Sequence, residues 1–372
     1  MSARTRLFRV RDPYNAAASE KRFWEAVQES HAFHYTHCSE YRTISDALRA
    51  SPEDLRDGGY DAIPFLPTLL FKNHHLFSMP AWRLPIKATS SGTKGRFSRI
   101  GFDAGGLFCG LRMVLKIGKR RKLFSPVPVH YVLLGYKPHR GNATAVTKTA
   151  FGATLFTPAL SRTYALIYGP DGYKPDLERI VDAILRRSRS RFPVRLMGFP
   201  SYTYFVLRRM EEQGLSVRLK KGSKILLGGG WKQFYAEQVD KSVLYDLARR
   251  VLGIEKCDIV EFFGAVEHPI LYADCDRHHF HVPAYSRVII RDVHTLEPVP
   301  NGTPGLVNLI TPMVRGTPIL SVMTDDLGIL QNGESCGCGI TSPYLEILGR
   351  VGLKDIKTCA AGAAELLTEV PR

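Results

Sequence analysis

The chain has 372 residues, 44% of them apolar, and a formal net charge of +16. It is long enough for one large domain or two, and its apolar share is typical of a globular protein. No run of about 18 apolar residues occurs, and no apolar segment follows Met1–Arg6, so we expect neither a membrane span nor a secretory signal. The odd number of cysteines, seven, favours a reducing cytoplasm with free or metal-bound thiols.

Positive charge is concentrated in two runs, Lys116–Lys122 and Arg186–Arg191. Such runs could bind a nucleic acid or an anionic membrane surface. No helix-turn-helix, zinc-finger or RNA-binding signature accompanies them, so we do not expect nucleic acid. A solvated basic surface is the favoured interpretation. A docking face for an acidic cofactor or an acidic carrier protein is the alternative.

The first eighty residues are expected to be mostly helical. The apolar spacing within Ala16–Ser30 predicts a helix, and Ser51, followed by proline, predicts the start of another. His31, His34 and His37 lie three residues apart and could face one metal on a helix. No acidic partner accompanies them, so a structural role is favoured over a metal site.

A polar loop, Thr89–Gly95, follows a proline-rich apolar stretch. Glycines let backbone N–H groups point inward, while hydroxyls and a lysine add donors and charge, so the loop could wrap an anion. The spacing of the common Walker loop is absent, and a flexible surface loop is the plain alternative. The next segment, Ser98–Asp103, could cap or enter a helix.

Strands and helices alternate over the following hundred residues. Apolar runs at 127–136 and 195–200 predict strands, and 176–187 and 202–212 have helical spacing. This alternation predicts an α/β architecture.

Three later apolar runs are each followed by glycines or carboxylates. These stretches are Gly228–Gly230, Phe263–Glu267 and Thr324–Gly328. Bare backbone at the end of a strand lets a flat ring or a phosphate approach closely. Each stretch could also be an ordinary turn.

The polar loop, these three stretches and Gly349-Arg350 make five stretches in all. They resemble the motifs of the adenylate-forming ligases and occur in the same order. That class of enzymes activates carboxylic acids with ATP. The resemblance implies an α/β fold, with a large N-terminal core of mixed sheets flanked by helices and a truncated C-terminal tail. We expect the core to span residues 1–345 and the short tail to span 346–372.

The resemblance also implies roles for individual residues. Glu267 would help to hold Mg²⁺, and Asp326 and Arg350 would bind the ribose. Val266 replaces a threonine of the family pattern, which removes a hydroxyl that usually contacts phosphate. The other implied ATP- and AMP-binding residues are Thr89, Ser90, Ser91, Gly92, Thr93 and Lys94 for the phosphates, and Gly228, Gly229, Gly230, Phe263 and Gly264 for the adenine.

Only 22 residues follow Arg350, too few for the usual C-terminal domain with its catalytic lysine. The acyl-protein synthetases of the bacterial bioluminescence fatty-acid reductase complex are similarly short, and Gly228–Lys232, Ile290–Asp292 and Ile356–Ala361 resemble that family. The resemblance implies that the chain activates a fatty or other carboxylic acid as acyl-AMP and then accepts the acyl group on Cys359. A reductase, acyltransferase or carrier protein would collect it.

Cys359 is therefore a candidate nucleophile. Two neighbours, Lys354 and Lys357, could favour its thiolate. A cysteine packed among small residues is the alternative. Lys94 and Lys232 are the candidates to replace the catalytic lysine of the missing C-terminal domain. The predicted catalytic residues are Cys359, Lys94 and Glu267.

A cysteine and histidine group predicts a closed, structural zinc site. It consists of Cys275, one histidine (His281 or His279), Cys336 and Cys338. The phenylacetate–CoA ligases have a similar Cys-x-Cys-Gly. Free thiols and solvated histidines are the alternative.

Three rival functions stay open. The first is an acyl- or aryl-CoA or acyl-carrier-protein ligase that uses an external thiol. The second is a degenerate adenylate-binding scaffold, and the third is a nucleic-acid-binding protein suggested by charge alone. An acyl pocket could be lined by Leu107, Phe108, Leu111 and the stretch Phe199–Phe205, although apolar side chains also build ordinary cores.

Overall fold

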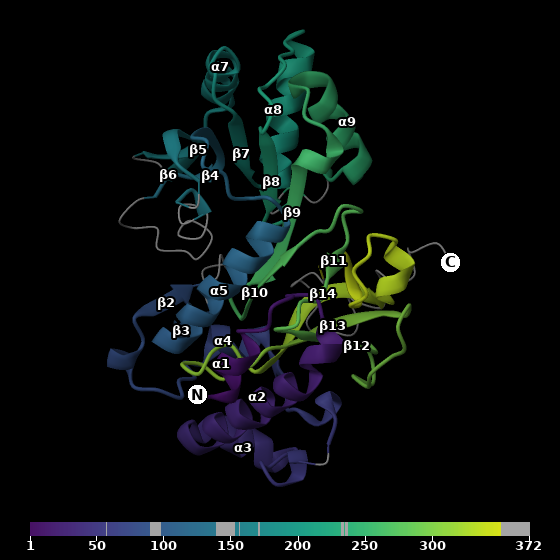
Figure 1. Cartoon of the computed structure of the whole chain (residues 1–372). Coiled ribbons are helices and arrows are strands. Elements are labelled where there is room, and N and C mark those ends of the chain that lie inside the picture. Colours follow the sequence, from purple (N-terminus) through teal and green to yellow (C-terminus); the bar gives the residue numbers. More distant parts are fainter. Residues whose placement is uncertain are drawn as a thin grey trace. The chain divides into compact units, whose positions relative to one another are not determined.

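The computed structural model describes residues 1–56, 58–89, 98–138, 153–155, 157–169, 172–231, 234 and 237–350 (Figure 1). The chain divides into two compact units. The first combines residues 1–117 with residues 264–372, and the second is the continuous stretch 118–263. The mixture of sheets and helices confirms the predicted α/β class.

The first unit is built on a sheet with the strand order β11-β15-β14-β13-β12. These strands pair antiparallel, and β1 joins β14 in parallel. β10 comes directly before β11 in the chain. β2 and β3 form a separate hairpin. The bounds are β1 (Leu66–Pro67), β2 (Ile86–Thr89), β3 (Arg99–Phe102), β10 (His268–Ala273), β11 (Phe280–His281), β12 (Arg287–Arg291), β13 (Pro304–Ile310), β14 (Ser321–Gln331) and β15 (Tyr344–Arg350).

Helices of the first unit are α1 (Ala3–Leu7), α2 (Ala16–His37), α3 (Ser39–Ala47), α4 (Thr68–Asn73) and α5 (Ala104–Arg120), the last of which runs to the unit boundary. The predicted helix at 16–30 is confirmed and is longer, because Asn15 caps it and its apolar face continues. The helix predicted at Ser51 is wrong. Ser51 and Asp54 bond to each other reciprocally, but only a 3₁₀ turn follows before the glycine pair at 58 and 59.

The histidines of α2 are core side chains. His31 bonds to the Tyr41 hydroxyl and the Ala50 carbonyl, and His34 bonds to the Ser78 hydroxyl at 2.7 Å. Burial lowers the pKa of His34 to about 3, so it is a neutral packing group.

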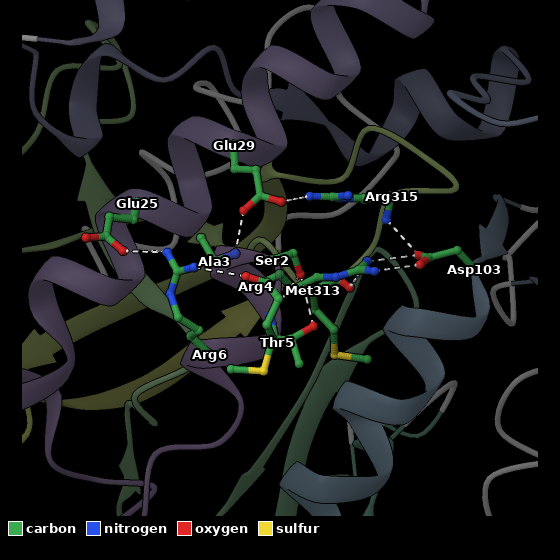
Figure 2. A network of polar contacts seen from close by, with 11 residues as sticks. Ser2, Ala3, Arg4, Thr5, Arg6, Glu25, Glu29, Asp103, Met313 and Arg315 are labelled. Atoms are coloured by element: carbon green, nitrogen blue, oxygen red, sulfur yellow. Dashed lines mark hydrogen bonds and ion pairs between the residues drawn. The ribbon is translucent and has the colours of Figure 1, made fainter.

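The N-terminal helix is anchored by a buried ion pair, drawn in Figure 2. Arg4 on α1 lies 2.9 Å from Asp103, which caps α5 by accepting from the Gly106 N–H. Arg4 also donates to the Met313 carbonyl, and the Arg315 N–H donates to Asp103. Asp103 therefore accepts from Arg4, Gly106 and Arg315, and the end of β3 is held to α1.

The second unit has the strand order β9-β8-β7-β4-β5-β6. All neighbours pair in parallel except β5 and β6. The strands are β4 (Val129–Tyr136), β5 (Ala159–Gly169), β6 (Gly172–Pro175), β7 (Val194–Gly198), β8 (Lys224–Gly228) and β9 (Ile259–Ala265), the last of which ends beyond the unit boundary. The helices are α7 (Leu177–Ser188), α8 (Pro200–Glu212) and α9 (Lys241–Leu252) (Figure 1). α8 connects the parallel strands β7 and β8, α9 connects the parallel strands β8 and β9, and α7 leads from β6 to β7.

One sheet face of this unit carries the main core. Val132, Leu196 and Leu227 pack there with Ile180 of α7 and Val206 of α8. The alternate residues Val129, Tyr131 and Leu133 form a smaller cluster. This period-two division is the expected result of side chains that alternate across a strand.

The expected boundary after residue 345 falls inside β15, whose pairing with β14 continues to Asp326↔Arg350. Among the described helices, none is both long and apolar enough to cross a membrane.

Candidate functional site

The glycine turn lies at the carboxyl end of β8. Gly228 pairs with Phe262 of β9, and Gly229 and Gly230 follow with φ of 83° and 66°. A side chain is rarely tolerated at those angles, so the turn presents bare backbone. In open parallel sheets, ligands bind at the carboxyl ends of the strands, which is where this turn and neighbouring Phe263 are found.

A second group of predicted site residues lies on neighbouring strands of the first unit. Asp326 on β14 is paired in register with Arg350 on β15, and the Arg350 Nε lies 3.9 Å from its carboxylate. Arg350 also lies 3.6 Å from Asp325. The strand register therefore brings together two residues that the sequence analysis assigned to the ribose.

Two residues near this pair were not predicted from the sequence. Lys72 of α4 lies 3.6 Å from Asp325, and Thr68 donates to the same carboxylate at 3.1 Å. Lys72 is largely buried, with 12% of its side chain exposed. The short pairing of β1 with β14 places α4 there, and no local sequence signal marks it.

Carboxylates outnumber cations at this place. Burial raises the pKa of Asp326, and the charges of Asp325 and Glu267 act in the same direction, while Arg350 opposes them. Glu267 lies in the turn between β9 and β10 and is itself buried. Three carboxylates thus act on one another here, with Lys72 and Arg350 as the cations recorded beside Asp325 and Asp326, and oxygen donors of this kind suit a hard divalent cation.

The predicted cysteine and histidine residues do come together. The ligand atoms of Cys275, His281, Cys336 and Cys338 all lie within 4.8 Å of one another. Cys275 and Cys336 have their sulfurs 3.5 Å apart, and the Cys338 sulfur lies 3.2 Å from the His281 Nε2. Ligands around a tetrahedral zinc with Zn–S bonds of 2.3 Å have sulfurs about 3.8 Å apart. The arrangement therefore has the compactness of a Cys₃His site.

The histidine of this cluster is oriented by its other ring nitrogen. His281 Nδ1–H donates to the Ser342 carbonyl at 2.6 Å, so its Nε2 lone pair faces Cys338. His279 is the other candidate of the sequence analysis. Its Nδ1 lies 3.1 Å from the Cys336 sulfur, and its ring stacks on Tyr344. His281 completes the compact set, and His279 lies beside it.

Several predicted residues have no described structure. Ser90, Ser91, Gly92, Thr93, Lys94, Lys232, Lys354, Lys357 and Cys359 lie outside the described residues. Thr89 ends β2 and pairs with Arg99 of β3. Of the suggested acyl-pocket residues, Phe108 is 67% exposed on α5, whereas Phe199 is buried in the second unit's core.

The fold is that of an adenylate-forming ligase. The chain superposes on 2-hydroxyisobutyryl-CoA ligase in its open conformation with a TM-score of 0.67, at 16% identity, over 92% of this chain and 77% of that one. The postadenylation structure of the same enzyme gives 0.66 at 16% identity, over 92% of this chain and 70% of the other. At these identities the likeness concerns the fold alone.

The chain belongs to the acyl-protein synthetase family, LuxE, whose sequence pattern matches residues 10–368. It is 26% identical over 353 residues to the long-chain-fatty-acid–luciferin-component ligase of Aliivibrio fischeri, covering 92% of this chain and 87% of that protein. The enzyme of the same name from Vibrio harveyi is 26% identical over 346 residues, with the same coverage. The predicted family and ligase class are confirmed.

Proposed function

We propose that this protein activates a long-chain carboxylic acid as its acyl adenylate and then takes the acyl group onto Cys359. The substrate carboxylate attacks the α-phosphate of ATP and pyrophosphate leaves. The Cys359 thiolate then attacks the acyl carbon, so that a thioester forms and AMP leaves. A reductase, acyltransferase or carrier protein would collect the acyl group. Family membership supports this proposal, as do the two relatives named as fatty-acid ligases.

The observation that favours it most is the register of Asp326 with Arg350. An ionised Asp326 can accept hydrogen bonds from both ribose hydroxyls, and the charge of Arg350 favours that ionised form against the burial that raises the pKa of Asp326. Within the second unit, the bare backbone of Gly228–Gly230 would suit the adenine, and the family resemblance assigns Phe263 to the same ring. It assigns Thr89–Lys94 of the first unit to the phosphates.

The donor set near Asp326 also fits magnesium. Glu267 would hold the ion, because it is buried, acts electrostatically on Asp326 and belongs to a group with more carboxylates than cations. When bound, Mg²⁺ would offset negative charge on the phosphate oxygens during displacement.

The test is to incubate the purified protein with ATP, Mg²⁺ and fatty acids of several lengths, and to measure intact and peptide masses. We expect one acyl adduct on Cys359 that hydroxylamine removes and that the Cys359→Ser variant lacks or makes resistant. Cys257→Ser is a matched control, because Cys257 is an exposed, free cysteine.

Two results would contradict the self-acylation step. Pyrophosphate release with no adduct until coenzyme A or a carrier is added would assign the acceptor role to an external thiol. Neither adduct nor pyrophosphate with any acid would leave a nucleotide-binding scaffold.

We further propose that Cys275, His281, Cys336 and Cys338 bind a structural zinc ion. The set has no fifth position for substrate in a closed tetrahedral site, so its role would be to tie the turn after β10 to the loop between β14 and β15. Six free cysteines among the described residues are also compatible with a reducing cytoplasm.

Metal analysis tests this proposal. We expect about one zinc per chain, loss of zinc and a lower melting temperature in Cys336→Ser, and neither change in Cys257→Ser. Wild-type protein that is free of zinc, yet melts at the same temperature with and without a chelator, would disprove it.

A further inference from the structure

Net charge is divided very unequally between the two units. Residues 118–263 contain 26 Lys and Arg against 12 Asp and Glu, a net charge of +14, whereas the other unit contributes only +2. Nearly all of the excess positive charge therefore belongs to fewer than half of the residues. This imbalance requires a physical explanation that nucleotide binding alone does not provide.

The excess is most dense in three short segments: 118–123, 186–191 and 218–222. Eleven of their 17 residues are Lys or Arg, and none is Asp or Glu. The segments precede β4, β7 and β8, which are parallel. Because parallel strands begin at the same edge of a sheet, all three segments gather at the amino edge.

Hydrogen bonds near the starts of these strands support this gathering. The ring of His130 in β4 lies 3.0 Å from the Ser190 hydroxyl. Arg195, near the start of β7, donates to the Leu123 carbonyl. The Val194 N–H donates to the Ser223 hydroxyl at 2.9 Å, and Ser223 is bonded in turn to the Lys220 carbonyl at 2.7 Å. The three segments are thus neighbours that form one basic edge.

The basic edge includes exposed side chains from each of its three segments. Lys119, Lys122, Arg189 and Lys220 are all exposed. Several carboxylates of the unit are engaged on its helices, where Glu178 lies 2.7 Å from Arg209 and Glu211 lies 2.8 Å from Arg250. A hollow of about 350 Å³ on α7 is lined by Asp182, Leu185, Arg186 and Arg189.

We propose that the basic edge, defined as segments 118–123, 186–191 and 218–222, docks an acidic partner protein of the acyl-carrier type. Opposite charge favours a carboxylate-rich partner and speeds its encounter. The proposal rests on the proposed function, because a thioester-forming ligase exchanges acyl groups with thiol carriers. The edge lies opposite the carboxyl ends of β8 and β9, so a docked partner leaves the glycine turn of this unit accessible.

The test is binding of fluorescently labelled, purified acyl carrier protein to the full-length enzyme without ATP, at about 50 mM and about 150 mM salt. The edge variant Lys122→Glu/Arg189→Glu/Lys220→Glu takes one residue from each segment. The matched control, Arg11→Glu/Lys21→Glu/Arg49→Glu, changes the net charge equally at exposed residues of the other unit. We expect the edge variant to weaken binding at least about tenfold and the control less than about threefold, with affinity falling as salt rises.

Three results would overturn the proposal: no binding of the carrier by the wild-type enzyme at low salt, equal weakening in both variants, or tighter binding of a 20-base-pair DNA duplex or phosphatidylglycerol vesicles than of the carrier. ATP–pyrophosphate exchange, measured on the same samples, separates the two proposals. Exchange without carrier binding defeats only the docking proposal, and absence of exchange defeats the proposed function.

Discussion

The two units of this chain differ in net charge and in how far their charged side chains are buried. The first unit is nearly neutral and buries ionisable groups beside partners, as in Arg4–Asp103 and in the Asp326 group. The second unit has a net charge of +14 and exposes much of it along the basic edge. Buried charges beside partners position atoms at a cost in desolvation, whereas exposed charges can recruit partners at little cost to folding.

Removal of one buried charge in the first unit should have the largest effect on stability. Arg4→Met leaves the Asp103 carboxylate buried without its cation, and we expect a loss of about 3 kcal/mol in the free energy of unfolding. Urea denaturation followed by tryptophan fluorescence measures it. The matched control is Arg6→Met on the same helix, whose ion pair with Glu25 is exposed, and this change should cost less than about 1 kcal/mol. Equal losses in the two variants would show that burial does not distinguish these pairs.

Asp326 should be the residue of this unit on which adenylation depends most strongly. Asp326→Asn removes the negative acceptor proposed for the ribose hydroxyls. Hydrogen bonds to charged groups contribute about 1.5–3 kcal/mol each, so kcat/KM for ATP should fall about 10²-fold or more. ATP–pyrophosphate exchange measures this. Asp246→Asn, the same change at an exposed residue of α9, should leave exchange unaltered, and a similar loss there would indicate a general effect.

Buried neutral histidines should make the first unit sensitive to acid. Burial lowers the pKa of both His34 and His268 to about 3. The unfolded chain takes up these protons near pH 6.5 and the folded chain does not, so stability falls as pH drops from about 6.5 towards 3. At pH 5 each should cost about 2 kcal/mol relative to neutral pH.

Urea midpoints at pH 7 and pH 5 measure this loss. His268→Asn can still bond to Ser286 and should have a smaller difference between the two midpoints than the wild type. A wild-type midpoint that does not change with pH would show that both histidines are protonated in the folded state.

The candidate site residues that could be named from the sequence are those in short local patterns. Glu267 and the Cys336–Cys338 pair lie in turns, where spacing along the chain reflects spacing in the fold, and Asp326 lies within β14 next to a shift in its register with β15. The choice of His281 over His279 required the structure, since either histidine suits the pattern. The division of the chain into units also could not be predicted, because strands on both sides of residues 118–263 form one sheet.

The contacts of Thr68 and Lys72 with Asp325 could not be predicted from any local sequence pattern. Thr68 reaches Asp325 across 257 residues of sequence, and the contact depends on a two-residue parallel pairing between β1 and β14. Pairing of distant strands is governed by the packing of the whole sheet, and a two-residue strand has no detectable periodicity. The contact of Lys72 with Asp325, the residue before the proposed ribose carboxylate, was therefore visible only in the fold.

Lys72 should have the smallest of these effects, because it acts through Asp325. In Lys72→Met, Asp325 loses one cation and competes with Asp326 for Arg350, so KM for ATP should rise about tenfold with little change in kcat. Lys72→Arg should restore most of the affinity, since it returns the charge, whereas a purely structural defect would lower the melting temperature and spare KM. An unchanged KM in Lys72→Met would mean that Arg350 alone is sufficient for both carboxylates, and the matching of charge in this unit would then be less strict than Arg4 and Asp103 indicate.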